Sequence, residues 1–482
     1  MEKVRVRFAP SPTGELHIGG LKTALTDFLL AKKNNGTFIL RIEDTDRKRY
    51  VEGAAERIIK SLEWAGITID EGPYIQSERL DIYKKYVDQL MAKGEAYLCF
   101  CTPERLEEMR NRQMAEKKAP MYDRCCLNLS KEEAEEKIKN GIPYAVRLKI
   151  PEGKTEFEDL VFGKITVENY VLDDQVILKS DGFPTYHLAV VVDDALMEIT
   201  HVVRGAEWLP STPKHILLYK ALGWDDKIPK FCHMPNILNK NHKKLSKREG
   251  DVSVEDFRKQ GYSPEAIINF IALLGWNPKT EQEIFTKEEL IEQFDISKMN
   301  KAGGVFDMDR LNWISAQHIK KMSDKELYKK TIEFLKEKEF FENAKPERKT
   351  EEYVKKVLSV EKERLSKFTE VGESNWFFFK DDFEIKKDDL RWKKMSDEEL
   401  KNSLEASLSV LNGIGESGWK KENIEKELLE AARDKRGDLL FPLRWVLTGQ
   451  KFSPTPFEVA WVLGKEESVR RINNALKLFN EE

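Results

Sequence analysis

The chain has few cysteines and no long apolar run, and each shortage excludes a class of protein. Five cysteines among 482 residues are too few for a disulfide framework, which agrees with a reducing compartment. No stretch approaches the ~18 consecutive apolar residues that a membrane span needs, and the N-terminal MEKVRVRF lacks the apolar core of a signal peptide. We therefore expect a cytoplasmic protein.

The chain also lacks a large excess of positive or negative charge. Lys and Arg number 81 and Asp and Glu number 85, which gives a net charge of −4. A nucleic-acid partner must therefore be bound by local basic surface, such as Lys243, Lys244, Lys247 and Arg248, although charged runs are usually only solvated surface. The chain is too long to fold around one hydrophobic core, and its length predicts roughly three domains.

The most informative segment is FAPSPTGELHIGG, residues 8–20. Apolar residues recur at helical spacing from Leu21, so a helix is predicted to begin near His17. Such a helix directs backbone N–H groups and the positive end of its dipole at a polyphosphate, and Gly19 and Gly20 allow a ligand to approach the backbone closely. The segment predicts a nucleotide-phosphate site, although an ordinary strand-to-helix turn fits the same residues.

A second polar segment, NHKKLSKR, covers residues 241–248. Together the two segments resemble the HIGH and KMSKS signatures of class I aminoacyl-tRNA synthetases, with Gly20 at the fourth HIGH position and KLSKR in place of KMSKS. Four further segments extend the resemblance to the glutamyl-tRNA synthetase family, over nearly the whole chain and in that family's order: RIEDTDRKRY from Arg41, YHLAVVVDD from Tyr186, HVVRGAEWLPSTPKH from His201 and PLRWVLTG from Pro442.

The resemblance implies an α/β fold, with a Rossmann-type parallel sheet that carries an inserted α+β acceptor-end-binding domain and is followed by an all-α anticodon-binding region. The domains expected on this basis are two halves of the catalytic domain (1–96 and 191–250), the insert (97–190), a stem-contact helical domain (251–320) and the anticodon-binding domain (321–482).

Local patterns predict the elements independently of the resemblance. Strands are predicted at 4–9, 38–42, 145–150, 161–167, 176–179 and 197–203, and helices from about 17, at 51–65, 78–93, 103–117 and 216–222, and from Pro264. Beyond about residue 320 the strand patterns disappear. Ser323, Ser396 and Thr455 then begin helix-capping patterns.

The resemblance implies a two-step reaction. L-Glutamate attacks the α-phosphate of ATP, with Mg2+, to form glutamyl-adenylate, and the terminal ribose of tRNA(Glu) then accepts the acyl group. The first step is expected to require tRNA itself, tRNA(Gln) stays open as a second acceptor, and the family is typically monomeric. The protein must supply positioning and charge neutralisation at the phosphates.

Catalytic and ATP-binding roles are carried over by motif position. The expected catalytic residues are His17, Gly19, Gly20, Lys244 and Lys247, of which Lys247 is the strongest candidate because a mobile lysine can follow charge onto the leaving pyrophosphate. The expected ATP-binding residues are Pro10, Ser11, His17, Gly19, Gly20, Trp208, Leu245, Ser246 and Lys247.

Glutamate brings one cation and two carboxylates, so its pocket should contain an acid and arginines. The residues that match the family's glutamate-binding positions are Arg7, Ala9, Ser11, Glu43, Tyr186 and Arg204. Arg204 is expected to bind the side-chain carboxylate and Glu43 the ammonium group. Trp208 either flanks the adenine or belongs to the core, and Asp193 and Asp194 either orient the ribose or end a strand, the latter being favoured for at least one of them.

The cysteines of the insert resemble a zinc site that some members of the family carry. Cys99, Cys101, Tyr122 and Cys126 are the expected ligands, with Cys125 as an alternative thiolate. The histidine of the usual pattern is absent, so two hypotheses stay open, bound zinc and free buried thiols.

Two other functions stay open at this point. A paralogue that glutamylates a modified tRNA base lacks the C-terminal helical region that is present here, and a catalytically silent tRNA-binding duplicate has no need to retain His17, Glu43, Arg204 and Lys247 together.

Overall fold

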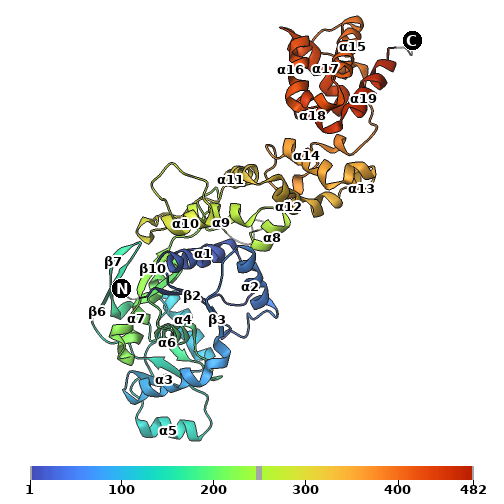
Figure 1. The fold of residues 1–482 in the computed structure, drawn as a ribbon. Helices are drawn as coiled ribbons and strands as arrows, with labels where there is room; N and C mark the ends of the chain where they lie inside the picture. Colours follow the sequence, from blue (N-terminus) through green and yellow to red (C-terminus); the bar gives the residue numbers. More distant parts are fainter. Residues whose placement is uncertain (1–2, 246–251, 480–482) are drawn as a thin grey trace. The chain divides into compact units, whose positions relative to one another are not determined.

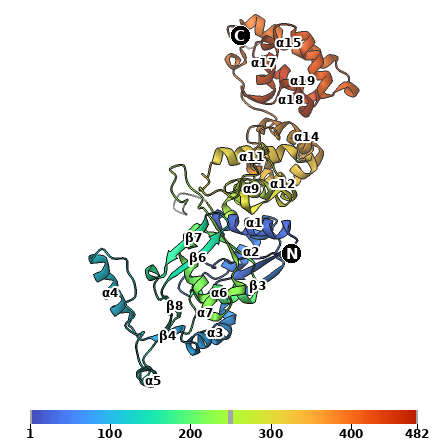
Figure 2. The ribbon, with the colours of Figure 1, turned by 90° about the vertical axis from the view of Figure 1, so that its left-hand side faces the viewer.

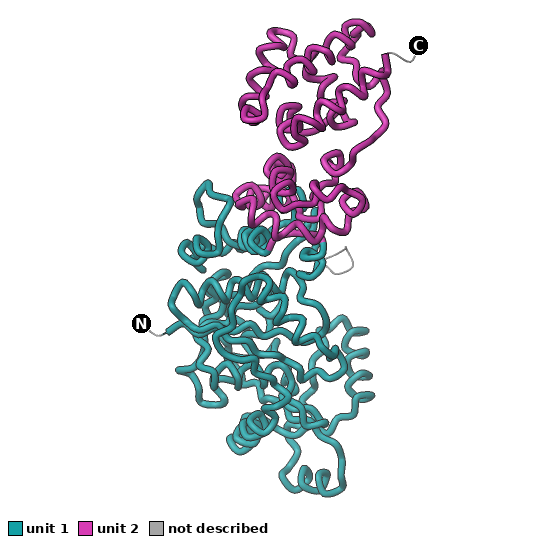
Figure 3. The backbone as a smooth tube through the Cα atoms, turned by 45° about the vertical axis from the view of Figure 1, so that its right-hand side comes forward, with its two compact units in different colours: residues 1–259, 264–310 teal, residues 260–263, 311–482 magenta. Residues whose placement is uncertain are grey.

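The computed structural model describes residues 3–245 and 252–479. The chain forms two compact units, residues 1–259 with 264–310 and residues 260–263 with 311–482 (Figure 3). No helix in the described part of the chain combines the length and the hydropathy that a bilayer span requires.

Parallel strands form the centre of the first unit (Figure 1). Its strands are β1 (Arg5–Phe8), β2 (Thr37–Ile42), β3 (Glu71–Ile75), β4 (Ala96–Cys99), β5 (Ala145–Leu148), β6 (Lys154–Asp159), β7 (Gly163–Glu168), β8 (Val176–Leu178), β9 (His201–Gly205) and β10 (Lys230–Met234). One sheet has the parallel order β1-β2-β3. A second has the order β7-β6-β10-β9, parallel from β6 to β9. The backbone N–H of Thr200 donates to Arg5 O at 2.9 Å and joins the two sheets beside β1.

The first unit also contains ten α-helices among its described residues. They are α1 (Ile18–Lys33), α2 (Ala54–Trp64), α3 (Leu80–Ala92), α4 (Pro103–Ala115), α5 (Lys131–Lys139), α6 (Tyr186–Leu196), α7 (Thr212–Leu222), α8 (Val254–Lys259), α9 (Pro264–Leu273) and α10 (Lys287–Gln293). The predicted helix near residue 17 is α1, whose apolar face buries Leu21, Leu25 and Phe28. It ends before Gly36, where a Cβ would overlap Val4 O. The structure confirms the predicted parallel α/β fold.

One predicted element is wrong. The run YHLAVVVDD, interpreted as the end of a strand, is helix α6, and the next strand therefore begins at His201 instead of Met197. The apolar run is buried on all sides, against α3, α7 and β8. A fully buried helix and a buried strand have the same continuous apolar pattern, so periodicity could not separate them.

The region between β3 and α6 contains a small antiparallel sheet of order β4-β5-β8. Helices α4 and α5 stand away from the parallel strands, as Figure 2 shows. The predicted strand at 161–167 forms an antiparallel hairpin with β6, and this hairpin joins the edge of β10. Asp159, the last residue of β6, is thereby brought beside β10.

The described residues of the second unit form helices joined by turns and loops, with no strand among them, as predicted. Its helices are α11 (Met308–Lys321), α12 (Asp324–Lys336), α13 (Glu339–Glu342), α14 (Glu351–Glu361), α15 (Asp397–Gly413), α16 (Lys421–Ala432), α17 (Arg436–Thr448), α18 (Pro456–Leu463) and α19 (Lys465–Lys477). Ser396 and Thr455 form complete capping boxes, and the Ser323 side chain accepts the Glu326 N–H.

Candidate active site

An open cleft of about 1820 Å3 lies at the carboxyl ends of β1, β2, β9 and β10, where parallel sheets usually bind ligands. Most of the predicted site residues line it: Arg7, Ala9, Ser11, His17, Gly19, Gly20, Glu43, Tyr186, Arg204, Trp208, Lys244 and Leu245. Pro10 is not among the lining residues, and its carbonyl accepts the Glu43 N–H at 3.0 Å. Ser246 and Lys247 lie outside the described residues.

The N-terminus of α1 faces the cleft with His17 as its N-cap. The His17 Nδ1 accepts the Gly19 N–H at 3.0 Å, so the neutral ring carries its proton on Nε2. A Cβ on Gly20 would lie 2.8 Å from Leu16 Cδ1, so glycine at this position also permits close packing beneath the helix start. The site therefore places His17 and the positive end of the helix dipole at the cleft, and both are suited to phosphate oxygens.

The chain that follows the second signature segment pairs with the residues at this helix start. Leu245 N–H donates to Ile237 O at 2.9 Å, which anchors the chain just before residues 246–251. Just after them, Ile18 N–H donates to Val252 O and Val254 N–H donates to Leu16 O, both at 2.9 Å. The chain on both sides of residues 246–251 is thus anchored, and the segment that follows them pairs directly with the HIGH residues.

A buried ion network lies beside the cleft and includes the lining residues Arg7 and Glu43. Asp194 accepts from Arg7 Nε at 3.0 Å and from Arg41 Nη1 at 2.7 Å, and Arg41 Nη2 donates to Glu43 at 3.0 Å. Burial raises the pKa of Glu43, against the lowering effect of Arg41 and Arg7. Burial also raises the pKa of Asp194, but the two arginines outweigh it and hold that pKa below its usual value. Glu43 is therefore an acceptor whose ionised form an incoming ammonium group would stabilise.

Asp193 has a similar structural role. Its carboxylate accepts hydrogen bonds from Gln76 at 3.0 Å, Arg79 at 2.9 Å and Tyr83 at 2.7 Å, and its side chain is fully buried. Neither Asp193 nor Asp194 ends a strand, because both lie within α6 and fix the arginines behind the cleft.

Arg204 differs from these arginines because only neutral acceptors hold it. It donates to His233 Nε2 at 3.0 Å, Tyr186 Oη at 3.1 Å, His215 Nδ1 at 3.2 Å and Thr212 Oγ1 at 2.8 Å. Among residues 3–245 and 252–479, no carboxylate oxygen lies within 4.0 Å of its guanidinium nitrogens, and only 5% of the residue is exposed.

A charge surplus follows from this arrangement. Four arginines of the cluster face three carboxylates: Arg7, Arg41, Arg79 and Arg204 against Glu43, Asp193 and Asp194. Asp27 is also buried nearby, and burial raises its pKa well above the usual value, which favours its neutral form. Arg204 is therefore the arginine of this cluster that has no carboxylate partner among the described residues, and this arrangement suits a carboxylate group of a ligand.

Trp208 lies over the same pocket. Its ring centroid is 4.3 Å from that of Tyr186, at an interplanar angle of 36°, and 37% of the residue is exposed. Since Tyr186 contacts Arg204, Trp208 lines the cleft close to Arg204 and is not a core residue.

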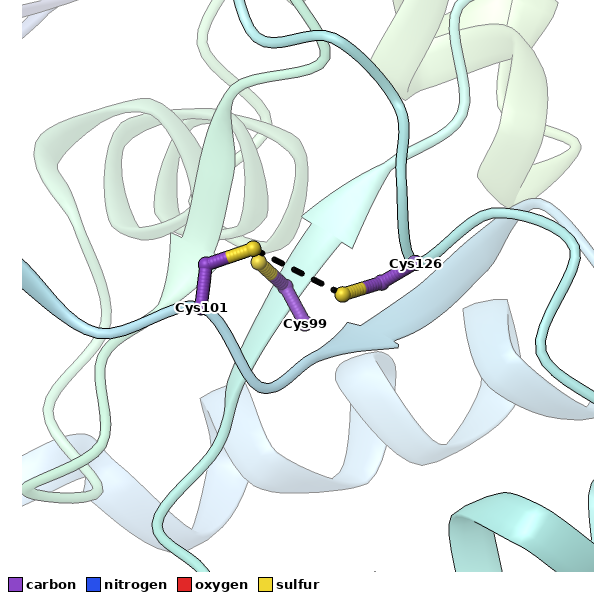
Figure 4. A group of neighbouring side chains, drawn as sticks. All are labelled: Cys99, Cys101 and Cys126. Carbon is purple, nitrogen blue, oxygen red and sulfur yellow. Dashed lines mark hydrogen bonds between the residues drawn. The ribbon is translucent and has the colours of Figure 1, made fainter. Parts of the chain in front are cut away.

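The cysteines predicted to bind zinc converge (Figure 4). The ligand atoms of Cys99, Cys101 and Cys126 lie within 4.8 Å of one another, and Tyr122 Oη lies 3.4 Å from the sulfurs of both Cys99 and Cys101. Cys101 Sγ is 3.6 Å from Cys126 Sγ. Tetrahedral zinc with Zn–S bonds of about 2.3 Å places its sulfurs about 3.8 Å apart, so the donor set fits this metal. Cys125 Sγ lies 3.3 Å from that of Cys101, but Cys125 is exposed.

A parallel sheet with HIGH-like and KMSKS-like segments at one cleft defines the catalytic domain of a class I aminoacyl-tRNA synthetase. The family model for "tRNA synthetases class I (E and Q), catalytic domain" matches residues 3–313, and the model for "Anticodon binding domain" matches residues 317–476. The glutamate--tRNA ligase of Clostridioides difficile (strain 630) is 47% identical over 97% of this chain and 98% of its own. That of Finegoldia magna is 46% identical over 99% of this chain and 100% of its own.

A solved structure agrees with these relatives. The crystal structure of a glutamate tRNA ligase from Elizabethkingia meningosepticum, in complex with its amino acid, matches with a TM-score of 0.88 and 37% identity over 99% of both chains. The chain belongs to the glutamate--tRNA ligase family.

Motif matching gave no role to Arg41 or to the histidines that hold Arg204. Arg41 is a charged residue within an apolar strand, and such a residue must be paired when buried, so a carboxylate partner for it could have been predicted. The histidines that contact Arg204 gave no such signal, because His215 and His233 lie on separate elements.

Proposed function

We propose that the chain activates L-glutamate with ATP and transfers it to the 3′-terminal adenosine of tRNA(Glu). The observation that carries this proposal is Arg204, a buried guanidinium that only neutral groups contact within the described residues, beside a helix start suited to phosphate. A carboxylate of the substrate supplies the anion that the pocket itself lacks.

Glutamate would lie with its side-chain carboxylate on Arg204 and its ammonium group on Glu43. Arg7 already pairs with Asp194, so it supports the pocket and attracts a carboxylate more weakly than Arg204 does. Glutamine would leave the Arg204 charge buried without an anion, a loss on the order of several kcal/mol.

ATP would bind with its phosphates at the start of α1. His17 would contact the phosphates there, Gly19 and Gly20 would allow them to approach the backbone closely, and Lys244 also lines the cleft, with its Nζ 3.3 Å from Glu207 Oε1. Lys247 and Ser246 are included by motif position alone, and Mg2+ by the phosphate chemistry. In-line attack by the glutamate carboxylate then needs only positioning and neutralisation of charge.

Zinc is part of the proposal as a structural ion. Cys99, Cys101, Cys126 and buried Tyr122 would hold it and thereby join the end of β4 to the segment that precedes α5. Metal analysis of protein purified without chelator tests this, and less than about a tenth of an equivalent of zinc would reject it.

The domain roles are assigned by family position. Residues 97–190 would bind the acceptor end, 251–320 the tRNA stem and 321–482 the anticodon end. An exposed aromatic ring suits the last role: Phe452 is 79% exposed, and Arg364 donates to the neighbouring Ser453 O. The proposal includes a cytoplasmic monomer, again by family position.

Charging of purified tRNA(Glu) and tRNA(Gln) with labelled glutamate and ATP tests the function directly. Labelled tRNA(Glu) alone indicates a discriminating enzyme, and label on both indicates a non-discriminating one. No label on either would reject the proposal in favour of a silent duplicate or a tRNA-modifying enzyme.

A further inference from the structure

Three histidines lie in a hydrogen-bonded row around Arg204, and the reaction as proposed uses none of them. His233 on β10 and His215 on α7 accept from the guanidinium, and His187 Nδ1 on α6 lies 2.9 Å from His215 Nε2. His215 and His233 are at most 2% exposed, so they contact Arg204 without access to bulk water.

The tautomers of these rings follow from their partners. Arginine can only donate, so His233 Nε2 and His215 Nδ1 must present lone pairs to Arg204. The proton of His233 therefore resides on Nδ1, which lies 2.6 Å from Asp159 Oδ2. The proton of His215 resides on Nε2 and is donated to His187 Nδ1.

Hydrogen-bond donors surround the Asp159 carboxylate and favour its ionised form. Its Oδ1 accepts the Val161 and Phe162 N–H groups, both at 2.9 Å, and its Oδ2 also accepts the His233 backbone N–H at 3.1 Å. Burial raises the pKa of Asp159, but the bond from His233 and these backbone donors outweigh it and lower that pKa overall. The carboxylate thus fixes the ring without contacting Arg204.

Both histidines that contact Arg204 are neutral in this environment. Burial and then the charge of Arg204 lower the pKa of His215 well below its ordinary value. Burial likewise lowers the pKa of His233, although Asp159 opposes it. Burial, with Lys214 and Arg204, lowers the pKa of His187 to about 4.

We propose that His215 and His233 are positioning residues that fix the Arg204 guanidinium through neutral acceptors, so that its full charge selects a substrate carboxylate over an amide. This inference rests on the proposed function of Arg204. A carboxylate at either position would hold the guanidinium equally well but would neutralise it, and the preference for glutamate over glutamine would be lost.

The matched pair His215→Gln and His215→Glu separates position from charge. The two side chains have nearly the same size, but one ends in a neutral amide and the other in a carboxylate. H215Q keeps an uncharged acceptor, so KM for glutamate is expected to stay within about fivefold of wild type. H215E is expected to raise KM for glutamate by about 30-fold or more and to lower the preference for glutamate over competing glutamine by at least about tenfold. KM for ATP should change by less than about twofold in both, because neither variant touches the phosphate end.

The outcomes are distinguishable. A wild-type protein that charges no tRNA rejects the proposed function itself. If wild type is active and the two variants raise KM for glutamate equally, the histidine is only a packing residue and the inference is wrong.

If H215E does not fold, a second variant tests the inference. In Asp159→Asn, an amide N–H facing His233 Nδ1 would reverse the ring tautomer and turn a donor toward Arg204. We expect KM for glutamate to rise about tenfold with KM for ATP unchanged, and an unchanged KM for glutamate in folded D159N would overturn the inference.

Discussion

Replacing Arg204 with methionine removes the surplus charge of the pocket and keeps a side chain of similar length. Removing one partner of a buried ion pair costs about 3–5 kcal/mol, and each 1.36 kcal/mol is tenfold in rate. Arg204 is 5% exposed and has no carboxylate partner within the described residues, so the substrate carboxylate would be that partner. We therefore expect kcat/KM for glutamate to fall by at least about 10²-fold.

The assay is the initial rate of tRNA(Glu) charging over a range of glutamate concentrations, repeated over a range of ATP. KM for ATP should stay within about threefold, because Arg204 lies at the amino-acid end of the cleft. Arg310→Met is the matched control, since Arg310 forms an exposed ion pair with Glu283 at 2.8 Å and should change kcat/KM by less than about twofold. A folded R204M protein whose kcat/KM for glutamate stays within about tenfold of wild type would refute the charge-surplus argument.

Three further predictions follow from other parts of the chain. Lys247→Ala should lower the rate of adenylate formation by about 10²-fold or more and leave tRNA affinity nearly unchanged. The rate is measured by pyrophosphate exchange in the presence of tRNA, and a near-normal rate would remove Lys247 from the mechanism. Cys125→Ser should retain about one equivalent of zinc whereas Tyr122→Phe should lose it, because Tyr122 is buried among the thiols and Cys125 is exposed; metal analysis showing the reverse would make Cys125 the fourth ligand. Burial raises the pKa of Glu361 to about 8, so the folded state binds more protons than the unfolded state from about pH 4.5 to 8 and stability falls as pH rises through that window. Glu361→Gln should remove this fall in the calorimetric transition of the helical unit, and an identical pH dependence in the variant would show that Glu361 does not cause it.

Much of the site was predictable because its chemistry is carried by contiguous motifs. His17 as a helix N-cap follows from the local sequence, since capping depends on residues within one turn. Glu43 follows β2 and Arg204 lies near the end of β9, and the carboxyl ends of parallel strands meet at the same edge, so their convergence could be expected from the element order. The helix starts at Ser396 and Thr455 are likewise local.

Other features depend on packing between distant segments. YHLAVVVDD was assigned to the wrong element because burial on all sides removes the periodicity that separates helix from strand. Asp159 and His233 are 74 positions apart and meet only because the β6–β7 hairpin adds to the edge of β10. No local pattern could have paired them.

The sequence by itself determined the parallel α/β catalytic fold, the helical C-terminal region and the identity of most residues that line the cleft. These depend on short-range patterns and on motifs that keep their spacing. Only the tertiary structure decided the electrostatics of the pocket: which arginines are already neutralised by Glu43, Asp193 and Asp194, and which one is left for the substrate. The charge available to a ligand depends on distances of a few ångströms between separate elements, and those distances are a property of the packed fold alone.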